Sequence, residues 1–154
     1  STMAPLNAYL TLIGLETLPL RMKQHMKNAE LVANFLKNHS KVNYVSWAGF
    51  KENIYHELAK KYFKDGFGSV FTFSLKSGYE GAMQLVENCN LISHLANVGD
   101  TRSLIVHPAS TTHRQLSKEQ KEKSGVGDTI IRLSIGLESH KDIIADLEGA
   151  LSTI

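Results

Sequence analysis

Two segments of the chain alternate apolar and polar residues with the two-residue period of a half-buried β-strand. The first covers residues 69–75 and the second covers residues 130–135. The apolar residues that share one face are Phe71, Phe73 and Leu75 in the first segment and Ile131, Leu133 and Ile135 in the second. Strands with one apolar and one polar face are typical of antiparallel or mixed sheets rather than of buried parallel ones.

The other apolar residues mostly recur with helical spacing. This spacing predicts helices over residues 5–39, 55–63 and 79–88, a short charged helix that Ser117 opens with Gln120 as a capping box, and a last helix capped by Ser139. Further strands are expected over residues 41–47 and 103–107. The predicted fold is α+β: a small antiparallel or mixed sheet of about four strands, covered on one face by helices, with a long broken N-terminal helix.

The N-terminal helix carries no charged side chain from Ser1 to Leu15. Pro5 suits its first turn, and Ser1 or Thr2 can cap it. A break is expected between Gly14 and Pro19, where Thr17 can cap the second part. No basic residue precedes the apolar stretch and Glu16 interrupts it, so we expect neither an export signal nor a membrane span. Its apolar character indicates a surface that contacts something outside this chain.

Composition excludes several classes of protein. The 154 residues suffice for one domain, and 17 basic against 15 acidic residues, dispersed along the chain, do not indicate nucleic-acid binding. Cys89 is the only cysteine, which rules out an internal disulfide; we expect it to be a buried small hydrophobe in a cytoplasmic protein. The seven histidines lack the close spacing of a zinc motif, so no metal site is expected.

Arg132 is the one residue that stands out on physical grounds. It lies in the middle of an apolar strand, on the face opposite Ile131 and Leu133. Its guanidinium needs solvent or a carboxylate, which its planar fork can bind through two parallel hydrogen bonds. Two interpretations stay open at this point: an exposed arginine on a solvated sheet face, or a carboxylate-binding residue.

Several separated motifs give the chain a resemblance to a known family. They are HLANVGDTRSLIVHPASTTH (94–113), IRLSIGLE (131–138) and IIADLEGAL (143–151), supported by APLNAYLTLIGLETLPLRMKQH (4–25), YHELAKKY (55–62) and SVFTFSLKSGYEGA (69–82). Together they resemble the C-terminal part of the cysteine and methionine metabolism family of pyridoxal-phosphate enzymes, which have fold type I.

The resemblance implies that a larger cofactor-binding domain belongs upstream. In the family, that domain carries the lysine that forms a Schiff base with pyridoxal phosphate, in a Ser-x-Thr-Lys-like context, and no lysine here follows a threonine. We therefore expect residues 1–154 to be a single C-terminal domain, with a junction helix region over 1–39 and an α+β domain over 40–154. The isolated chain is expected to bind no cofactor and to be inactive, whereas the full-length enzyme uses pyridoxal phosphate.

The resemblance also implies roles for three residues. Arg132 matches the arginine that binds the substrate α-carboxylate, and Asn97 matches a position whose backbone meets the same carboxylate. Thr112 falls at a threonine near that carboxylate and the active-site lysine. Ala96 replaces a glutamate found in some cystathionine-forming or cystathionine-cleaving relatives. No catalytic, cofactor-binding or metal-binding residue is expected within this chain.

The activity that the resemblance implies for the full-length enzyme is the conversion of O-acetylhomoserine and sulfide to homocysteine and acetate, a step of methionine biosynthesis. A related methionine γ-lyase or cystathionine enzyme is an alternative. A free-standing amino-acid-binding or interaction module without catalysis is another. The family's assemblies further imply a cytoplasmic homo-oligomer without nucleic-acid or membrane partners.

Overall fold

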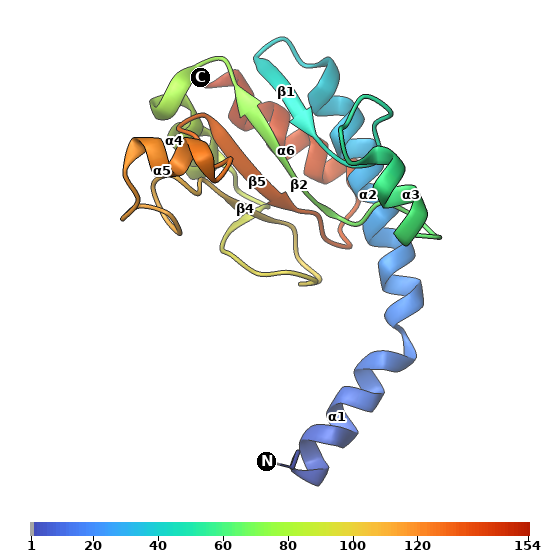
Figure 1. The fold of residues 1–154 in the computed structure, drawn as a ribbon. Helices are drawn as coiled ribbons and strands as arrows, with labels where there is room; N and C mark the ends of the chain where they lie inside the picture. The colour runs from blue at the N-terminus through green and yellow to red at the C-terminus, as the bar shows by residue number, and fades with distance from the viewer. Residues whose placement is uncertain (1) are drawn as a thin grey trace.

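The computed structural model describes residues 2–154 and contains six helices and five strands within them (Figure 1). The helices are α1 (Pro5–Glu16), α2 (Leu18–Asn38), α3 (His56–Tyr62), α4 (Gly78–Asn88), α5 (Lys118–Lys123) and α6 (His140–Ser152). The strands are β1 (Val42–Ser46), β2 (Val70–Leu75), β3 (Ser93–His94), β4 (Leu104–Val106) and β5 (Ile130–Ser134). None of the helices combines the length and the hydropathy that a membrane span requires.

The five strands form one mixed sheet in the order β1-β2-β5-β4-β3. Neighbours are antiparallel except β3 and β4, which are parallel. In the register of the three central strands, Arg132 lies between Thr72 of β2 and Val106 of β4. The α+β class and the mixed sheet are confirmed, but the sheet has five strands and not about four, because two-residue β3 is too short to show an alternating pattern.

Helices α2, α4 and α6 cover one face of the sheet (Figure 1). The alternating faces of β2 and β5 point toward these helices as predicted, and Phe73, Ile131 and Leu133 are completely buried. The helical part of the core consists of Ala29, Val32, Ala33 and Leu36 in α2, Ala82, Leu85 and Val86 in α4, and Ile143, Leu147, Ala150 and Leu151 in α6. The prediction of helices on one face is therefore confirmed.

The N-terminal helix breaks at Thr17, inside the predicted interval. Pro5 occupies the first turn of α1 as expected. The predicted caps are wrong. Ala4 stands at the N-cap of α1, so Thr2 does not cap it, and Ser1 lies outside the described residues. Thr17 has φ −104° and ψ 3°, not the extended backbone that lets a side chain reach the next turn, and its Oγ1 accepts from Arg21 Nε at 3.3 Å instead.

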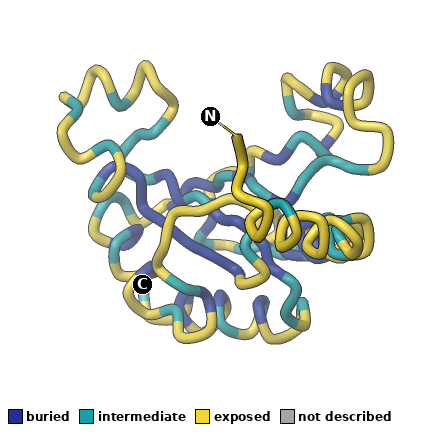
Figure 2. Tube along the Cα trace, turned by 90° about the horizontal axis from the view of Figure 1, so that it is seen from below, coloured by how far each residue is buried: buried dark blue, intermediate teal, exposed yellow. Residues whose placement is uncertain are grey.

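Helix α1 stands apart from the rest of the fold. All of its described residues are outside the core, and Figure 2 shows most of it as exposed. Its large apolar side chains Leu6, Tyr9, Leu10, Leu12, Ile13 and Leu15 are each at least 45% exposed. One face of helix α2 packs into the core, so the predicted junction region 1–39 joins an exposed helix to a helix with one buried face. The division of the chain at residue 39 stays a prediction.

Three further expectations concern individual side chains. The capping box is confirmed, since Ser117 Oγ accepts from Gln120 N while Gln120 Oε1 accepts from Ser117 N. Ser139 stands at the N-cap of α6, but its hydroxyl makes no capping bond. Cys89 is only partly buried, at the edge of the core, and not enclosed. Burial and the nearby Asp146 carboxylate raise the pKa of its thiol to about 12.

Candidate functional site

Arg132 occupies the centre of the sheet face that α2, α4 and α6 do not cover. Seen from below, the segments that carry α3 and α5 project beyond this face on opposite sides of it (Figure 2). Arg132 is half-buried, and its neighbours Val106 and Ile130 are buried. The guanidinium therefore lies partly desolvated between two protruding segments, in surroundings that strengthen its attraction for an anion.

The Arg132 side chain has one hydrogen bond within residues 2–154. Its Nη2 donates to the backbone oxygen of Asn97 at 3.4 Å, at the long end of the hydrogen-bond range. Over the same residues it forms no ion pair with a carboxylate. A guanidinium carries five N–H donors in a fixed fork, so most of that fork is available to an incoming carboxylate.

The Asn97 side chain points into its own loop. Asn97 Oδ1 accepts from Val98 N at 2.8 Å, and Nδ2 donates to Asp100 Oδ2 at 3.3 Å. Asp100 Oδ1 in turn accepts from Arg102 N and Nε at 3.0 and 3.3 Å, and these bonds lower the pKa of the Asp100 carboxyl to about 2. The atom that Asn97 presents to Arg132 is thus its backbone oxygen, while Arg102 engages the carboxylate of the same loop.

A buried polar network holds the base of this loop, and the sequence analysis missed it. Ser103 is completely buried and donates to Glu138, from its N to Oε1 at 2.7 Å and from its Oγ to Oε2 at 2.9 Å. Gly136 N donates to Ser103 Oγ at 2.9 Å. From α2, Asn28 Nδ2 donates to the backbone oxygens of Gly136 and Glu138 at 3.0 and 2.8 Å. The only signal in the sequence was Asn28 itself, a polar residue inside an apolar helical stripe.

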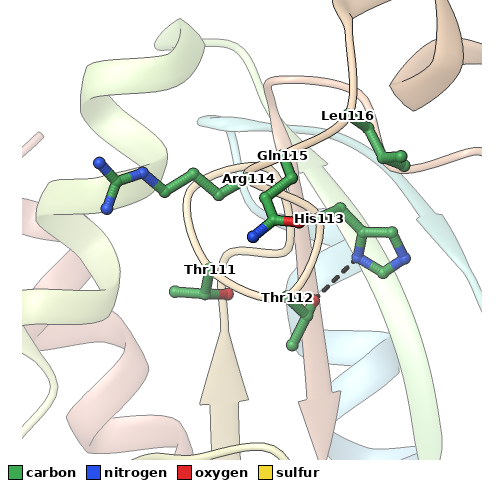
Figure 3. Close-up of a pocket in the computed structure, with 6 residues that line it drawn as sticks. All are labelled: Thr111, Thr112, His113, Arg114, Gln115 and Leu116. Carbon is green, nitrogen blue, oxygen red and sulfur yellow. Dashed lines mark hydrogen bonds between the residues drawn. The ribbon is translucent and has the colours of Figure 1, made fainter.

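Thr112 lies in the exposed loop that follows β4, as Figure 3 shows. Its Oγ1 is 2.8 Å from Nδ1 of His113, and both line a hollow of about 720 Å³ formed by residues 111–116. No hydrogen bond joins Thr112 to Arg132 or Asn97 in the part of the chain that the structure describes. The structure therefore brings together Arg132 and Asn97, two of the three predicted site residues.

His107 anchors the start of the Thr112 loop. Its Nε2 donates to the backbone oxygen of Asp128 at 3.0 Å, so the neutral ring accepts at Nδ1 from Ser110 Oγ, also at 3.0 Å. Thr111 Oγ1 donates to the backbone oxygen of His107 at 2.7 Å. Burial lowers the pKa of the His107 imidazole below its ordinary value. Burial thus disfavours the charged form of the ring, and its hydrogen bonds tie the loop to the segment before β5.

Comparison with known proteins shows which family model and which relatives the chain matches. The sequence model of the family described as "Cys/Met metabolism PLP-dependent enzyme" matches residues 1–152. The chain is 46% identical over 150 residues to O-acetyl-L-homoserine sulfhydrylase 1 of Thermus thermophilus, covering 97% of this chain and 36% of the relative. It is 44% identical over 154 residues to an L-methionine gamma-lyase of Fusobacterium nucleatum, covering all of this chain and 39% of the relative.

Two solved structures share the fold. A candidate O-acetylhomoserine (thiol)-lyase from Campylobacter jejuni, which carries a pyridoxyl-lysine monophosphate at its position 205, gives a TM-score of 0.91 at 47% identity. Cystathionine gamma synthase from Xanthomonas oryzae gives 0.89 at 38% identity. Each alignment covers 98% of this chain, and 36% and 39% of the respective neighbour. The chain thus spans little more than a third of the proteins it matches, and its expected place at their C-terminal end stays a prediction.

The described residues do not fit the covalent site of pyridoxal phosphate. Eleven of the thirteen lysines are exposed. The two that are partly buried already donate to backbone oxygens, Lys41 Nζ to that of Leu151 at 2.7 Å and Lys121 Nζ to that of Ala109 at 2.8 Å. Within residues 2–154 no three histidine, cysteine, aspartate or glutamate residues are grouped to hold a metal ion. What this segment offers chemically is the guanidinium of Arg132 beside the Asn97 backbone oxygen.

Proposed function

The chain belongs to the Cys/Met metabolism family of PLP-dependent enzymes, and we propose that it supplies the site for the substrate α-carboxylate in a full-length O-acetylhomoserine sulfhydrylase. The family implies pyridoxal phosphate in that enzyme. Its lysine belongs to a segment outside these 154 residues, and the covalent chemistry takes place there. The isolated chain is accordingly inactive.

The observation that carries the proposal is the state of Arg132. The Arg132 guanidinium is half-buried in the middle of the sheet, so it has lost part of its hydration. Among the described residues no carboxylate forms an ion pair with it that would offset this loss. A substrate carboxylate that binds its fork through two hydrogen bonds supplies that partner. The bound amino acid would then be held by one end, which fixes the direction in which its side chain points.

The contact between Arg132 and Asn97 also restricts the orientation of the guanidinium. The Asn97 backbone oxygen accepts from one terminal nitrogen at 3.4 Å, so one corner of the fork is directed toward the loop that carries Asn97 before substrate arrives. Thr112 is the third residue of the proposed site, and among the described residues its hydroxyl bonds only to His113. Its role near the carboxylate remains part of the proposal.

Sulfhydrylase activity is tested on the full-length enzyme by product analysis. O-acetylhomoserine and sulfide should give homocysteine and acetate. A second candidate is methionine γ-lyase activity, which is supported by a relative of that name at nearly the same identity as the sulfhydrylase. Release of methanethiol from methionine, without homocysteine formation from O-acetylhomoserine, would establish that candidate instead.

The role of Arg132 is tested by steady-state kinetics on Arg132→Ala and Arg132→Lys. Loss of a charge-assisted contact should lower kcat/KM roughly 30- to 1,000-fold, equivalent to about 2–4 kcal/mol. Lysine keeps the charge but loses the planar fork, so it should not restore the activity. Thermal melts of both variants should stay near that of the parent, since the side chain faces away from the core. Normal kinetics in both variants would return Arg132 to a structural role.

A further inference from the structure

Glu138 is a carboxylate that the proposed function does not use, although it lies six residues after Arg132 on the same segment. It is half-buried, and within residues 2–154 it forms no ion pair with a basic residue. Both of its oxygens instead accept from one residue, Ser103, at 2.7 and 2.9 Å. Carboxylates that accept short bonds from a buried backbone N–H and hydroxyl fix the segment they bind.

Ser103 is the last residue of the loop that presents Asn97 to Arg132. The loop itself is exposed from Leu95 to Gly99, and its own hydrogen bonds are local ones among Asn97, Asp100 and Arg102. Apart from the Arg132 bond to Asn97 and a backbone bond at Thr101, its attachment to the domain is at its two ends. At one end is β3, which has only two residues, and at the other end is the Glu138–Ser103 pair.

The packing around this pair leaves little room for adjustment. A Cβ at Gly136 would overlap the Glu138 carboxylate and the backbone of Arg102 and Ser103, so the two chain segments approach each other as closely as glycine allows. Leu137 N donates to the backbone oxygen of Thr101 at 2.8 Å, which adds a second bond between the same segments. Because the two segments are closely packed, a change in the position of the Glu138 side chain should also shift Ser103 and the loop that ends there.

We propose that Glu138 is a positioning residue for the carboxylate site: by holding Ser103, it sets the place of the Asn97 backbone oxygen relative to the Arg132 guanidinium. This inference rests on the function proposed above. Glu138 touches neither Arg132 nor the substrate. Its effect is to orient the fork through the loop, so that a substrate carboxylate meets both terminal nitrogens at once. Loss of the Glu138 carboxylate should therefore weaken recognition of the α-carboxylate more than it weakens recognition of any other part of the ligand.

The test compares two probes that differ only in the α-carboxylate: L-homoserine, which has it, and 3-aminopropan-1-ol, which lacks it. Their dissociation constants are measured on the full-length holoenzyme and on Glu138→Gln, which keeps the size of the side chain and removes its charge. Homoserine should bind roughly 10- to 100-fold more weakly to the variant, the loss expected when a binding group is misplaced by about an ångström. The amine should bind within about twofold of the parent, as for a neutral surface change.

Two further variants complete the design. Glu87→Gln, at an exposed position of α4, is the matched control and should leave both dissociation constants unchanged. Ser103→Ala removes the hydroxyl but keeps the backbone bond to Glu138, so it should give a smaller loss for homoserine in the same direction. Hydrogen exchange followed by mass spectrometry should show faster exchange over residues 95–103 in Glu138→Gln than in the control, which reports the loop independently of any ligand.

The outcomes separate this inference from the function on which it rests. Homoserine binding that falls in Arg132→Ala but not in Glu138→Gln or Ser103→Ala overturns the positioning role and leaves the carboxylate site in place. Homoserine binding that is intact in Arg132→Ala overturns the proposed function together with the inference. An equal loss for homoserine and the amine in Glu138→Gln shows a general structural effect and also overturns it.

Discussion

Asn28 joins helix α2 to the end of β5, and its replacement by alanine should destabilise the fold measurably. The side chain is completely buried; it donates to the backbone oxygens of Gly136 and Glu138 and accepts from Gln24 Nε2 at 2.7 Å. Leaving two buried backbone oxygens without donors should cost about 3 kcal/mol. Alanine regains about 0.7 kcal/mol of helix propensity. The net loss should be about 2 kcal/mol, which lowers the melting temperature of a chain of this size by roughly 4–8 °C.

The assay is thermal and urea unfolding of the 154-residue chain, followed by circular dichroism. Asn34→Ala is the matched control, because Asn34 lies on the same helix, is exposed, and donates only to the backbone oxygen of Glu30 at 2.8 Å. The control should be unchanged or slightly stabilised, since it gains the same propensity without losing a buried partner. Equal free energies of unfolding for the two variants would refute the reasoning that this network holds α2 against β5.

Three other predictions concern the isolated chain. Incubation with pyridoxal phosphate and reduction with borohydride should label no single lysine, and peptide mapping that finds one specific site would contradict the placement of the cofactor lysine elsewhere. The exposed apolar side chains of α1 should drive self-association, which the double change Leu6→Lys and Leu10→Lys should reduce in sedimentation experiments; an unchanged sedimentation coefficient would argue against an interface role for α1. Because the pKa of Cys89 is raised to about 12, little of it is thiolate at neutral pH. Iodoacetamide should therefore alkylate it roughly a hundredfold or more slowly than free cysteine at pH 8, with a rate that rises with pH, and an ordinary rate would show that the thiol is not desolvated.

The strands and helices that carry the core could be predicted from the sequence because their signals are local. The alternation of Phe71 and Phe73, or of Ile131 and Leu133, reports directly which face is buried. The break at Thr17 follows from Pro19, and the capping box from Ser117 and Gln120. Strand β3 could not be predicted because it has only two residues, which are too few to show an alternating pattern. These two residues are extended because they pair with β4.

The candidate site was predictable only in part, for a physical reason. Arg132 could be found because a charge in an apolar strand breaks a pattern. The contacts that position it join residues far apart in the chain, Arg132 with Asn97 and Glu138 with Ser103, and such pairs leave no periodic trace. Capping by Thr17 and Ser139 failed because a suitable residue type does not determine the backbone angles at its position.

The central claim, that Arg132 binds the substrate α-carboxylate, is tested most directly by a crystal structure of the full-length enzyme with L-homoserine bound. The account predicts two carboxylate oxygens facing the Arg132 guanidinium, each about 2.7–3.0 Å from one of its nitrogens. The Asn97 backbone oxygen should remain within hydrogen-bond distance of the same group. A ligand whose carboxylate is held by other residues, with Arg132 bonded only to Asn97 or to water, would contradict the account.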